Sequence, residues 1–231
     1  MPRNQKRVPL LAILLLVIGL AAAGCGQEVG EEFVPQPGDL LFQDCDTGPL
    51  CDAIEKVTTG FDGANVTHVG IVAGGAGAEP IVIEAVSAGV VRTPLKEFLA
   101  RSLDAKGRPK VAVGRVTGPA RELIAAALAR AGELVGSPYD EVFAIDNDAY
   151  YCSELVYVIF LQANRGRPVF MLAPMTFKDP DTGKTFPAWQ EYFDKLGEPI
   201  PEDKPGINPG GISRAAAVTI IHQYGQLSHR Q

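Results

Sequence analysis

The chain has few of the residues that build metal and cofactor sites. Its only histidines are His68, His222 and His229, and no two of its four cysteines have Cys-x-x-Cys spacing. Cysteines and histidines at short spacings are the usual ligands of structural zinc. We therefore expect no bound metal and no cofactor. A redox function of the cysteines is disfavoured for the same reason.

The sequence also lacks a basic cluster, which nucleic-acid-binding proteins need. It has 21 basic and 27 acidic residues and a formal net charge of −6. Residues 1–24 include three basic and no acidic residues, so a chain that began at Cys25 would carry 18 basic against 27 acidic residues, a net charge of −9. Such an acidic chain is a poor partner for nucleic acid and gains nothing from anionic lipid head groups.

The N-terminus has no apolar run long enough to span a membrane, yet it has a targeting pattern. Arg3, Lys6 and Arg7 precede an apolar run over Leu10–Ala23, which is shorter than the roughly 20 residues of a spanning helix. A basic start, a short apolar run and small residues at its end are typical of a secretory signal peptide. We therefore expect residues 1–24 to be removed on export.

The end of this run, Ala22-Ala23-Gly24-Cys25, resembles a bacterial lipobox, in which Cys25 would be lipidated and become the N-terminus. The match is incomplete, because Ala22 stands where leucine is usual. Ordinary secretory cleavage after a small residue is the alternative. The lipobox interpretation predicts an exported lipoprotein of a bacterial cell envelope, held at the membrane by its acyl anchor, with residues 25–36 as a tether.

The other cysteines fit an oxidising compartment. Cys45 and Cys51 are six residues apart, and we expect them to form a disulfide; two reduced, buried thiols are the alternative. Cys152 is then left alone, which makes it the candidate reactive thiol. A lone cysteine is more often a small buried apolar residue than a nucleophile, so this interpretation needs support from the surroundings of Cys152.

The rest of the chain is predicted to form one α+β domain over residues 37–231. About 200 residues can bury a sizeable core, and no internal repeat or low-complexity tract interrupts them. Residues 165–211 are rich in proline and glycine but carry aromatics, and we expect ordered loops around one short helix. The partly segregated elements indicate an antiparallel sheet with helices. We expect strands at 40–42, 66–73, 80–86, 89–92, 110–116 and 218–224, and helices at 49–58, 94–103 with Thr93 as N-cap, 119–135, 152–164 and 188–196.

A histidine and a glutamate are expected to face each other in the hairpin of residues 66–73 and 80–86. If the strands pair symmetrically about Ala76, His68 lies directly opposite Glu84. Opposite residues share a sheet face, with Cβ atoms roughly 4.5–5.5 Å apart, so the carboxylate can hold one imidazole nitrogen. Gly70, on the same face, would leave a gap for a helix end. A β-bulge would shift this register, and each residue alone is more often structural than catalytic.

Cys152 stands at the start of a predicted helix. The positive end of the helix dipole lowers the pKa of a thiol there, and a nearby histidine lowers it further. Free backbone N–H groups in the same turn can stabilise an oxyanion. Three β-branched residues between 156 and 159 would also suit a strand, but the length of the run and Gly166 favour a helix. Cys152, His68 and Glu84 thus supply the three groups of thiol-based acyl transfer.

These segments resemble the permuted papain-like hydrolases, specifically the YiiX/YaeF-like branch of the NlpC-type cysteine peptidases. The likeness covers most of residues 37–224, and the histidine strand precedes the cysteine helix, as in the permuted branch. It implies an antiparallel sheet packed against a helix that bears the nucleophile Cys152, with His68 as base and Glu84 as the orienting group. It places Tyr139, Tyr151 and Ser153 beside the substrate pocket. The matching motifs are Gly38–Phe42, Thr67–Val72, Val82–Ala85, Val90–Leu95, Pro138–Asp140, Tyr151–Val156 and Asn208–Ser213.

Three functions follow as hypotheses. The first is a cell-envelope cysteine hydrolase that cleaves an amide bond, in a peptidoglycan peptide or an N-acyl amide, through a Cys-His-Glu triad and an acyl-enzyme. The second is a thiol-dependent acyltransferase that passes the acyl group to a lipid or an amine. The third is a catalytically silent binding module of the envelope, which the three intact residues Cys152, His68 and Glu84 disfavour.

Overall fold

The computed structural model describes residues 33–45, 48–74 and 79–229. The predicted signal peptide, Cys25 and residues 25–32 of the predicted tether lie outside these ranges. The folded unit begins at Phe33, whose ring stacks on that of His222 with 4.1 Å between the ring centroids. Residues 33–36 therefore belong to the domain and not to a tether, because a packed aromatic ring anchors the segment that carries it.

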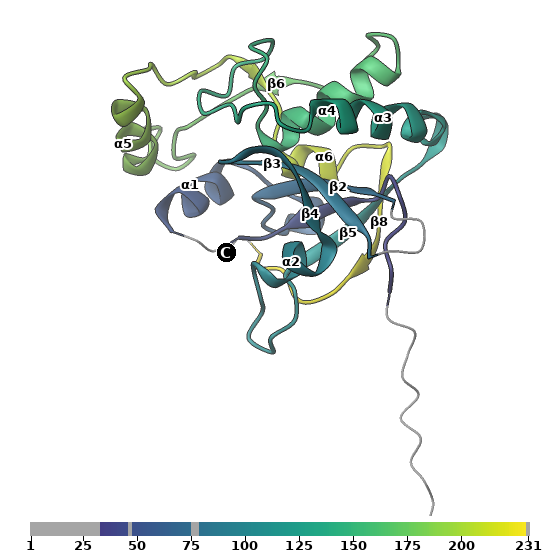
Figure 1. Ribbon diagram of the computed structural model, residues 1–231. Coiled ribbons are helices and arrows are strands. Elements are labelled where there is room, and N and C mark those ends of the chain that lie inside the picture. The colour runs from purple at the N-terminus through teal and green to yellow at the C-terminus, as the bar shows by residue number, and fades with distance from the viewer. Residues whose placement is uncertain (1–32, 46–47, 75–78, 230–231) are drawn as a thin grey trace, which may run out of the picture. The chain divides into compact units, whose positions relative to one another are not determined.

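A six-stranded sheet forms the centre of the domain (Figure 1), and every pair of neighbouring strands is antiparallel. The predicted α+β class is confirmed. A second, two-stranded sheet lies in the segment that the sequence marked as rich in proline and glycine. In sheet order, the large sheet consists of β4 (Gly89–Pro94), β3 (Ile81–Val86), β2 (His68–Ala73), β1 (Leu40–Gln43), β5 (Val111–Val116) and β8 (Val218–Gln223), and the small one of β6 (Ala173–Pro174) and β7 (Pro205–Gly206).

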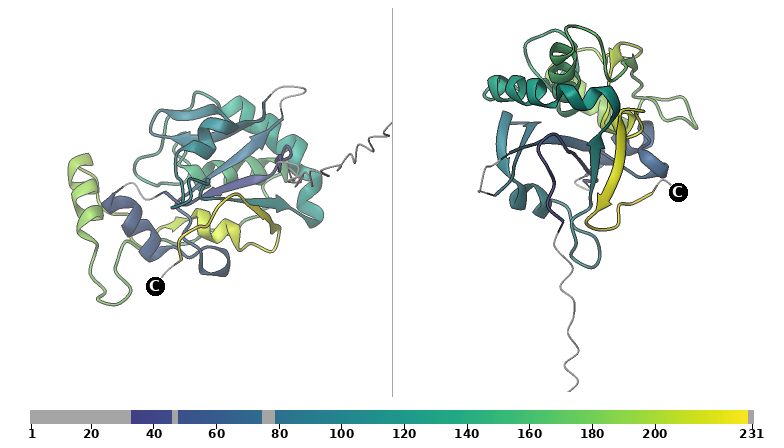
Figure 2. Two further views of the ribbon diagram at one scale, coloured as in Figure 1. Left: turned by 90° about the horizontal axis from the view of Figure 1, so that it is seen from below. Right: turned by 90° about the vertical axis from the view of Figure 1, so that its right-hand side faces the viewer.

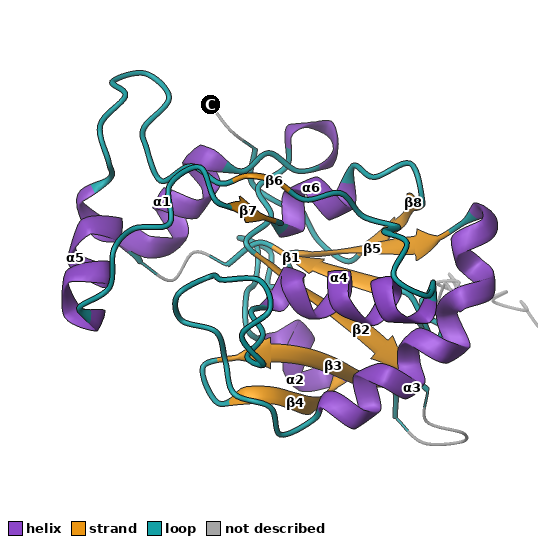
Figure 3. Cartoon of the chain, turned by 90° about the horizontal axis from the view of Figure 1, so that it is seen from above, coloured by secondary structure: helices purple, strands orange, loops and turns teal. Residues whose placement is uncertain are grey.

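Helices cover both faces of the large sheet (Figures 2 and 3). On one face lie α3 and α4, which pack on each other and bury the larger apolar cluster, whereas α2 covers the other face with a smaller cluster around Phe98. None of the helices in the described part of the chain is both long and apolar enough to cross a membrane. The helices are α1 (Pro49–Val57), α2 (Leu95–Ala100), α3 (Ile124–Leu134), α4 (Cys152–Ala163), α5 (Pro187–Leu196) and α6 (Pro209–Ser213), with 3₁₀ turns at Phe61–Gly63 and Gly118–Leu123.

The helix α4 lies at the buried centre of the fold, which explains why its sequence fits both a helix and a strand. Leu155, Val156, Ile159 and Phe160 have no exposed surface. β-branched side chains are tolerated here because α4 is enclosed between the sheet and α3, so that packing outweighs local propensity. The helix begins at Cys152, as the sequence predicted, and the backbone N–H of Tyr151 donates to the Glu154 carboxylate in a capping box.

One predicted helix start is wrong. Thr93 is the penultimate residue of β4 and not the N-cap of α2, which follows Pro94 and starts at Leu95. The side chain of Thr93 points to a different partner: its hydroxyl donates to Glu84 Oε1 at 2.5 Å. A buried carboxylate that needs a donor thus takes the hydroxyl that sequence reasoning assigned to the helix end.

The segment of residues 165–211 is ordered, as predicted, but holds more structure than one helix. It contains β6, α5, β7 and the start of α6. The helix α5 packs against α1 at one side of the domain (Figure 1). Between them lies a third apolar cluster, which is rich in aromatic rings and centred on Phe177, Trp189 and Phe193. This cluster stands next to the site described below.

Candidate active site

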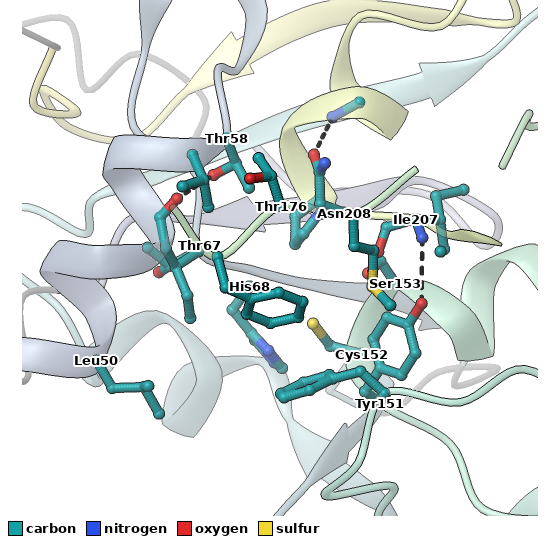
Figure 4. A pocket seen from close by; sticks show the side chains of 18 of the residues that line it. Leu50, Thr58, Thr67, His68, Tyr151, Cys152, Ser153, Thr176, Ile207 and Asn208 are labelled. Carbon is teal, nitrogen blue, oxygen red and sulfur yellow. Dashed lines mark hydrogen bonds between the residues drawn. The ribbon is translucent and has the colours of Figure 1, made fainter. Parts of the chain in front are cut away.

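A cavity of about 590 Å³ opens at the end of the sheet, at the N-terminus of α4. Cys152 and His68 both line it, and Figure 4 shows the thiol of Cys152 beside the His68 ring. The structure therefore brings together two residues that are far apart in the sequence. Tyr139, Tyr151 and Ser153, which were predicted to border the pocket, also line the cavity.

Cys152 is the first residue of α4 and is 8% exposed. Burial raises the pKa of its thiol, but the hydrogen bond and the charge of His68, together with the backbone N–H groups of Val69 and Ser153, lower it below its ordinary value. Such donors stabilise a thiolate, as does the positive end of the helix dipole. The environment therefore favours the nucleophilic form of the thiol.

His68 and Glu84 are in contact, although the predicted hairpin register is wrong. Ile71 pairs with Ile83, where symmetric pairing about Ala76 required residue 81. The ladder is thus displaced by two residues, which keeps every side chain on its predicted face. Glu84 becomes the diagonal neighbour of His68, within reach of long side chains, and the two meet with 2.6 Å between His68 Nε2 and Glu84 Oε2.

The displaced register also gives Gly70 a different role from the predicted one. A Cβ atom at Gly70 would lie 3.3 Å from the Glu84 Cβ and 2.5 Å from Val82 Cγ1. The missing side chain therefore makes room for the strand that carries Glu84, and not for a helix end. The imidazole itself lies at the beginning of β2, where it is 14% exposed, and its centroid is 5.8 Å from that of Phe98 in α2.

Two residues that the sequence did not connect with the site complete the surroundings of Glu84. Arg101, directly after α2, donates from Nη1 to Oε2 at 2.7 Å and from Nη2 to Oε1 at 2.5 Å, and Thr93 donates to Oε1. Glu84 has no exposed surface. Burial raises the pKa of its carboxyl, but the bonds from His68, Arg101 and Thr93 lower it to about 2. The carboxylate is therefore ionised at neutral pH.

The charges of the site support each other. Burial alone would lower the pKa of His68, but its contacts with the Cys152 thiolate and with Glu84 raise it to about 9. Because Nε2 is bonded to Glu84, Nδ1 is the nitrogen left for the thiol. A thiolate, an imidazolium and a carboxylate in sequence form the charge arrangement of an activated cysteine nucleophile.

Two of the predicted pocket residues hold the rim of the cavity. The Tyr151 hydroxyl accepts the backbone N–H of Ile207 at 3.1 Å, and the Ser153 hydroxyl donates to the backbone oxygen of Ile207 at 2.9 Å. The residues on both sides of Cys152 thus fix one point of the C-terminal segment (Figure 4). Tyr139 lines the wall, where burial raises the pKa of its phenol, so that it stays neutral.

The predicted disulfide between Cys45 and Cys51 is absent from the structure. Cys45 follows β1 and its backbone N–H donates to the Thr67 hydroxyl at 2.9 Å, whereas Cys51 lies in the first turn of α1. Spacing along the chain does not fix the approach of two Cβ atoms that a disulfide requires. Burial raises the pKa of Cys45 to about 11, so this thiol is a poor nucleophile beside Cys152.

A second buried glutamate has the opposite charge state, which gives a test of the electrostatics. Glu154 is 1% exposed, and burial followed by the charge of Asp140 raises its pKa from 4.5 to about 8. A group whose pKa is raised in the folded state contributes stability that is fully present below its pKa in the unfolded chain. This stability is lost as the pH rises through its pKa in the folded protein. Glu154→Gln keeps an oxygen for the Tyr151 N–H but cannot ionise.

We expect Glu154→Gln to melt with the wild type at pH near 5 and several degrees above it at pH near 9, where the wild-type carboxyl must ionise in the core. Thermal denaturation followed by circular dichroism at both pH values measures the difference. Equal melting temperatures of the two proteins at alkaline pH would show that Glu154 is not protonated in the folded state at neutral pH.

Comparison with known proteins identifies the relatives of this chain. The family model described as "Permuted papain-like amidase enzyme, YaeF/YiiX, C92 family" matches residues 34–222. The uncharacterized protein YiiX of Escherichia coli (strain K12) is 34% identical over 189 residues, which cover 81% of this chain and 86% of that protein. A crystal structure of YiiX from Escherichia coli O157:H7 has 29% identity and a TM-score of 0.64, covering 82% of this chain and 97% of that one.

The solved YiiX is described as a metalloprotein. In residues 33–45, 48–74 and 79–229 of the present chain, no group of three or more His, Cys, Asp or Glu side chains is placed to hold a metal ion. The range matched by the family model includes Cys152, His68 and Glu84 and the sheet that positions them. The chain therefore belongs to the permuted papain-like amidases of the YaeF/YiiX type, a family of cysteine amidases and peptidases.

Proposed function

We propose that Cys152, His68 and Glu84 are the catalytic triad of an amidase that releases an acyl group from an amine. The observation that carries the proposal is the 2.6 Å contact between Glu84 Oε2 and Nε2 of His68, whose side chain lines the same cavity as the Cys152 thiol with its lowered pKa. This is the order of groups that a cysteine hydrolase needs: nucleophile, base and orienting carboxylate.

The chemistry follows from the positions of these groups. The Cys152 thiolate attacks the amide carbonyl carbon, and the backbone N–H groups in the first turn of α4 stabilise the oxyanion. The C–N bond breaks as His68 gives its Nδ1 proton to the leaving amine, which leaves a thioester on Cys152. Water then attacks the thioester with His68 as base, and the products are a carboxylic acid and the free thiol.

The lining of the cavity favours an apolar acyl group, and so an N-acyl amide over a peptidoglycan peptide. Apolar residues of α1 and of the segment from Met171 to Tyr192 form part of the walls of the cavity that contains Cys152. An apolar chain gains free energy there in proportion to the area it buries. A peptidoglycan peptide would have to direct its charged groups to the few polar lining residues, such as Glu141 and Arg214, and away from these apolar walls. The apolar lining residues include Leu50, Ile54, Val57, Phe143, Met171, Met175, Phe177 and Trp189.

A substrate series tests the proposal. We expect kcat/KM of the full-length protein to rise with acyl length in N-acyl amides of one amine, and peptide amides without an acyl chain to be poor substrates. Mass spectrometry of rapidly quenched samples should show the acyl group on Cys152. An acylated peptide elsewhere in the chain, or better turnover of the charged peptides, would contradict this assignment.

A charge placed in the apolar wall should weaken binding of the acyl chain selectively. Leu50 lines the cavity from α1 (Figure 4), and we expect Leu50→Asp to raise KM for long N-acyl substrates about tenfold, with little change for short ones. Leu103 is 50% exposed and does not line the cavity, so Leu103→Asp is the matched control and should leave both KM values unchanged. An equal effect of both changes on both substrates would argue against an acyl site at α1.

The same apolar cavity favours one second function, transfer of the acyl group to an acceptor other than water. A bound apolar chain keeps the thioester in place while the amine leaves, and an acceptor amine or alcohol can then replace water in the second step. Adding candidate acceptors during turnover separates the two functions. Free acid as the sole product identifies a hydrolase, and a product that contains the acceptor identifies a transferase.

We also propose that the enzyme acts in the cell envelope, exported by residues 1–24 and anchored through a lipid on Cys25. The support is the sequence pattern, because these residues lie outside the described ranges. Metabolic labelling with a radioactive fatty acid tests the anchor: label in the wild type that is lost in Cys25→Ala supports it, and label in neither protein overturns it.

A further inference from the structure

The carboxylate of Glu84 makes more contacts than the orientation of one imidazole requires. Oε2 accepts His68 and Nη1 of Arg101, and Oε1 accepts Thr93 and Nη2 of Arg101. A carboxylate has about four lone-pair positions, so its capacity is filled. The partners come from three elements, β2, the end of β4 and the residue that follows α2.

Arg101 fixes the orientation of the Glu84 carboxylate through the geometry of its guanidinium as well as through its charge. Its guanidinium lies 5.4 Å from the centroid of the Phe98 ring, and the same ring lies 5.8 Å from that of His68. Phe98 is completely buried and so gives a rigid surface that both polar groups contact. The two parallel N–H bonds of an arginine fork fix the plane of the carboxylate, which a lysine ammonium cannot do.

We propose that Arg101 is a positioning residue of the active site, which keeps Glu84 ionised and in one orientation so that His68 faces the thiol. The proposal rests on the proposed triad and deepens it. Arg101 is absent from the residues that line the cavity, so it acts through Glu84 and His68 and not on the substrate. Without it, a carboxylate with no exposed surface loses two of its four donors and becomes easier to protonate.

The stability of the Cys152 thiolate should therefore depend on Arg101. When Glu84 takes up a proton, His68 loses the charge that favours its imidazolium, and the Cys152 thiolate in turn loses its counterion. The pH at which the thiolate forms should therefore rise when Arg101 is replaced. Arg101 side-chain surface is 35% exposed, so its substitution leaves no closed cavity in the core.

The test is the pH profile of iodoacetamide alkylation at Cys152, resolved by peptide mass spectrometry, on full-length protein. We expect Arg101→Met to move the acid limb of the profile upward by about one pH unit or more, and to lower the rate at pH near 6 roughly tenfold. Arg101→Lys keeps the charge without the fork and should give an intermediate profile.

Arg115 provides a matched control. It donates from Nε and Nη2 to the buried Asp39 at 2.9 and 2.8 Å and has a 34% exposed side chain, but it lies on β5 near the opposite end of β1 from the site. We expect Arg115→Met to lose a similar ion pair and to keep the wild-type profile. An unchanged profile in both Arg101 variants, or the same displacement in Arg115→Met, would overturn the proposal.

The experiment also separates this inference from the triad itself. His68→Ala should abolish fast alkylation whatever Arg101 does. If His68→Ala has no effect, the triad is wrong. If His68→Ala removes fast alkylation and the Arg101 variants behave as the wild type, the triad stands and only the role of Arg101 fails. Arg101→Lys decides the matter should Arg101→Met not fold, because a wild-type profile there would show that the fork is dispensable.

Discussion

Replacing Cys152 by serine is expected to lower amide hydrolysis by on the order of 10³-fold or more and to leave the melting temperature close to that of the wild type. The site stabilises a thiolate through His68 and two backbone N–H groups. A serine hydroxyl is far less acidic than a thiol, so the same surroundings do not ionise it. The measurement is kcat/KM for an N-acyl amide, with the acyl-enzyme sought by mass spectrometry.

Cys45→Ser is the matched control for that change. Cys45 is partly buried, and burial raises the pKa of its thiol to about 11, so its loss should leave hydrolysis unchanged within a factor of two or so. Activity retained in Cys152→Ser and lost in Cys45→Ser would show that the nucleophile had been assigned to the wrong cysteine.

Glu84→Gln is expected to have the second largest effect, a loss of roughly 10²–10⁴-fold in kcat, because the neutral amide no longer stabilises the His68 imidazolium. It should also lower the stability of the fold, since Arg101 is left without its counterion. Breaking a fully buried pair costs about 3–5 kcal/mol. Arg101 is 35% exposed and recovers hydration, so we expect a smaller loss, about 2 kcal/mol.

The pH dependence distinguishes this effect from a general loss of packing. The pKa of Glu84 is lowered from 4.5 to about 2, so its charge contributes stability above the unfolded value, and this stability is lost as the pH falls toward about 2. The difference in melting temperature between Glu84→Gln and the wild type should therefore be largest near neutral pH and shrink in acid. Glu154→Gln is the control for replacing a buried carboxyl by an amide. The Glu154 carboxyl is protonated in the folded state at neutral pH, so this variant should keep full activity. A difference that is constant in pH would contradict the assignment.

The hairpin shows why the sequence predicted the contact between His68 and Glu84 despite a wrong register. Face alternation in a strand has period two, and an error of two residues preserves it. His68 and Glu84 therefore stay on one face whether they are opposite or diagonal, and Glu84 is long enough to reach across. An error of one residue would have placed them on different faces. The pattern of apolar residues fixed the face, and the ends of the strands, which set the register, carried no comparable signal.

The partners of Glu84 could not be found in this way. Arg101 and Thr93 lie nine or more residues from Glu84 in sequence, on elements whose approach depends on how α2 turns after β4. Thr93-Pro94 also matched the local signal of a helix start. The hydrogen-bond requirement of the buried Glu84 carboxylate outweighs this local preference for a helix start. The one available clue was Glu84 itself, a charged residue in an apolar strand, which predicts a partner without naming it.

Apart from Cys152, His68, Tyr139, Tyr151 and Ser153, the residues that line the cavity were also hidden from sequence reasoning. The segment of residues 165–211 was predicted to be ordered from its aromatics, but its position depends on contacts that join distant parts of the chain. The hydroxyls of Tyr151 and Ser153 fix Ile207, and Phe143, with a backbone φ of 55°, packs its ring against Tyr151 and Trp189. A residue with φ in this range is uncommon outside glycine, and nothing in the sequence around Phe143 indicates it.

The pH profile of iodoacetamide alkylation at Cys152, compared between the full-length wild type and His68→Ala, tests the central claim most directly and needs no knowledge of the substrate. We predict rapid alkylation well below the free-thiol pKa of roughly 8.5, because the imidazolium, whose pKa is about 9, stabilises the thiolate, and loss of this rapid reaction in His68→Ala. Alkylation that rises only near the free-thiol pKa and is unchanged by His68→Ala would contradict an activated cysteine and favour a catalytically silent binding module.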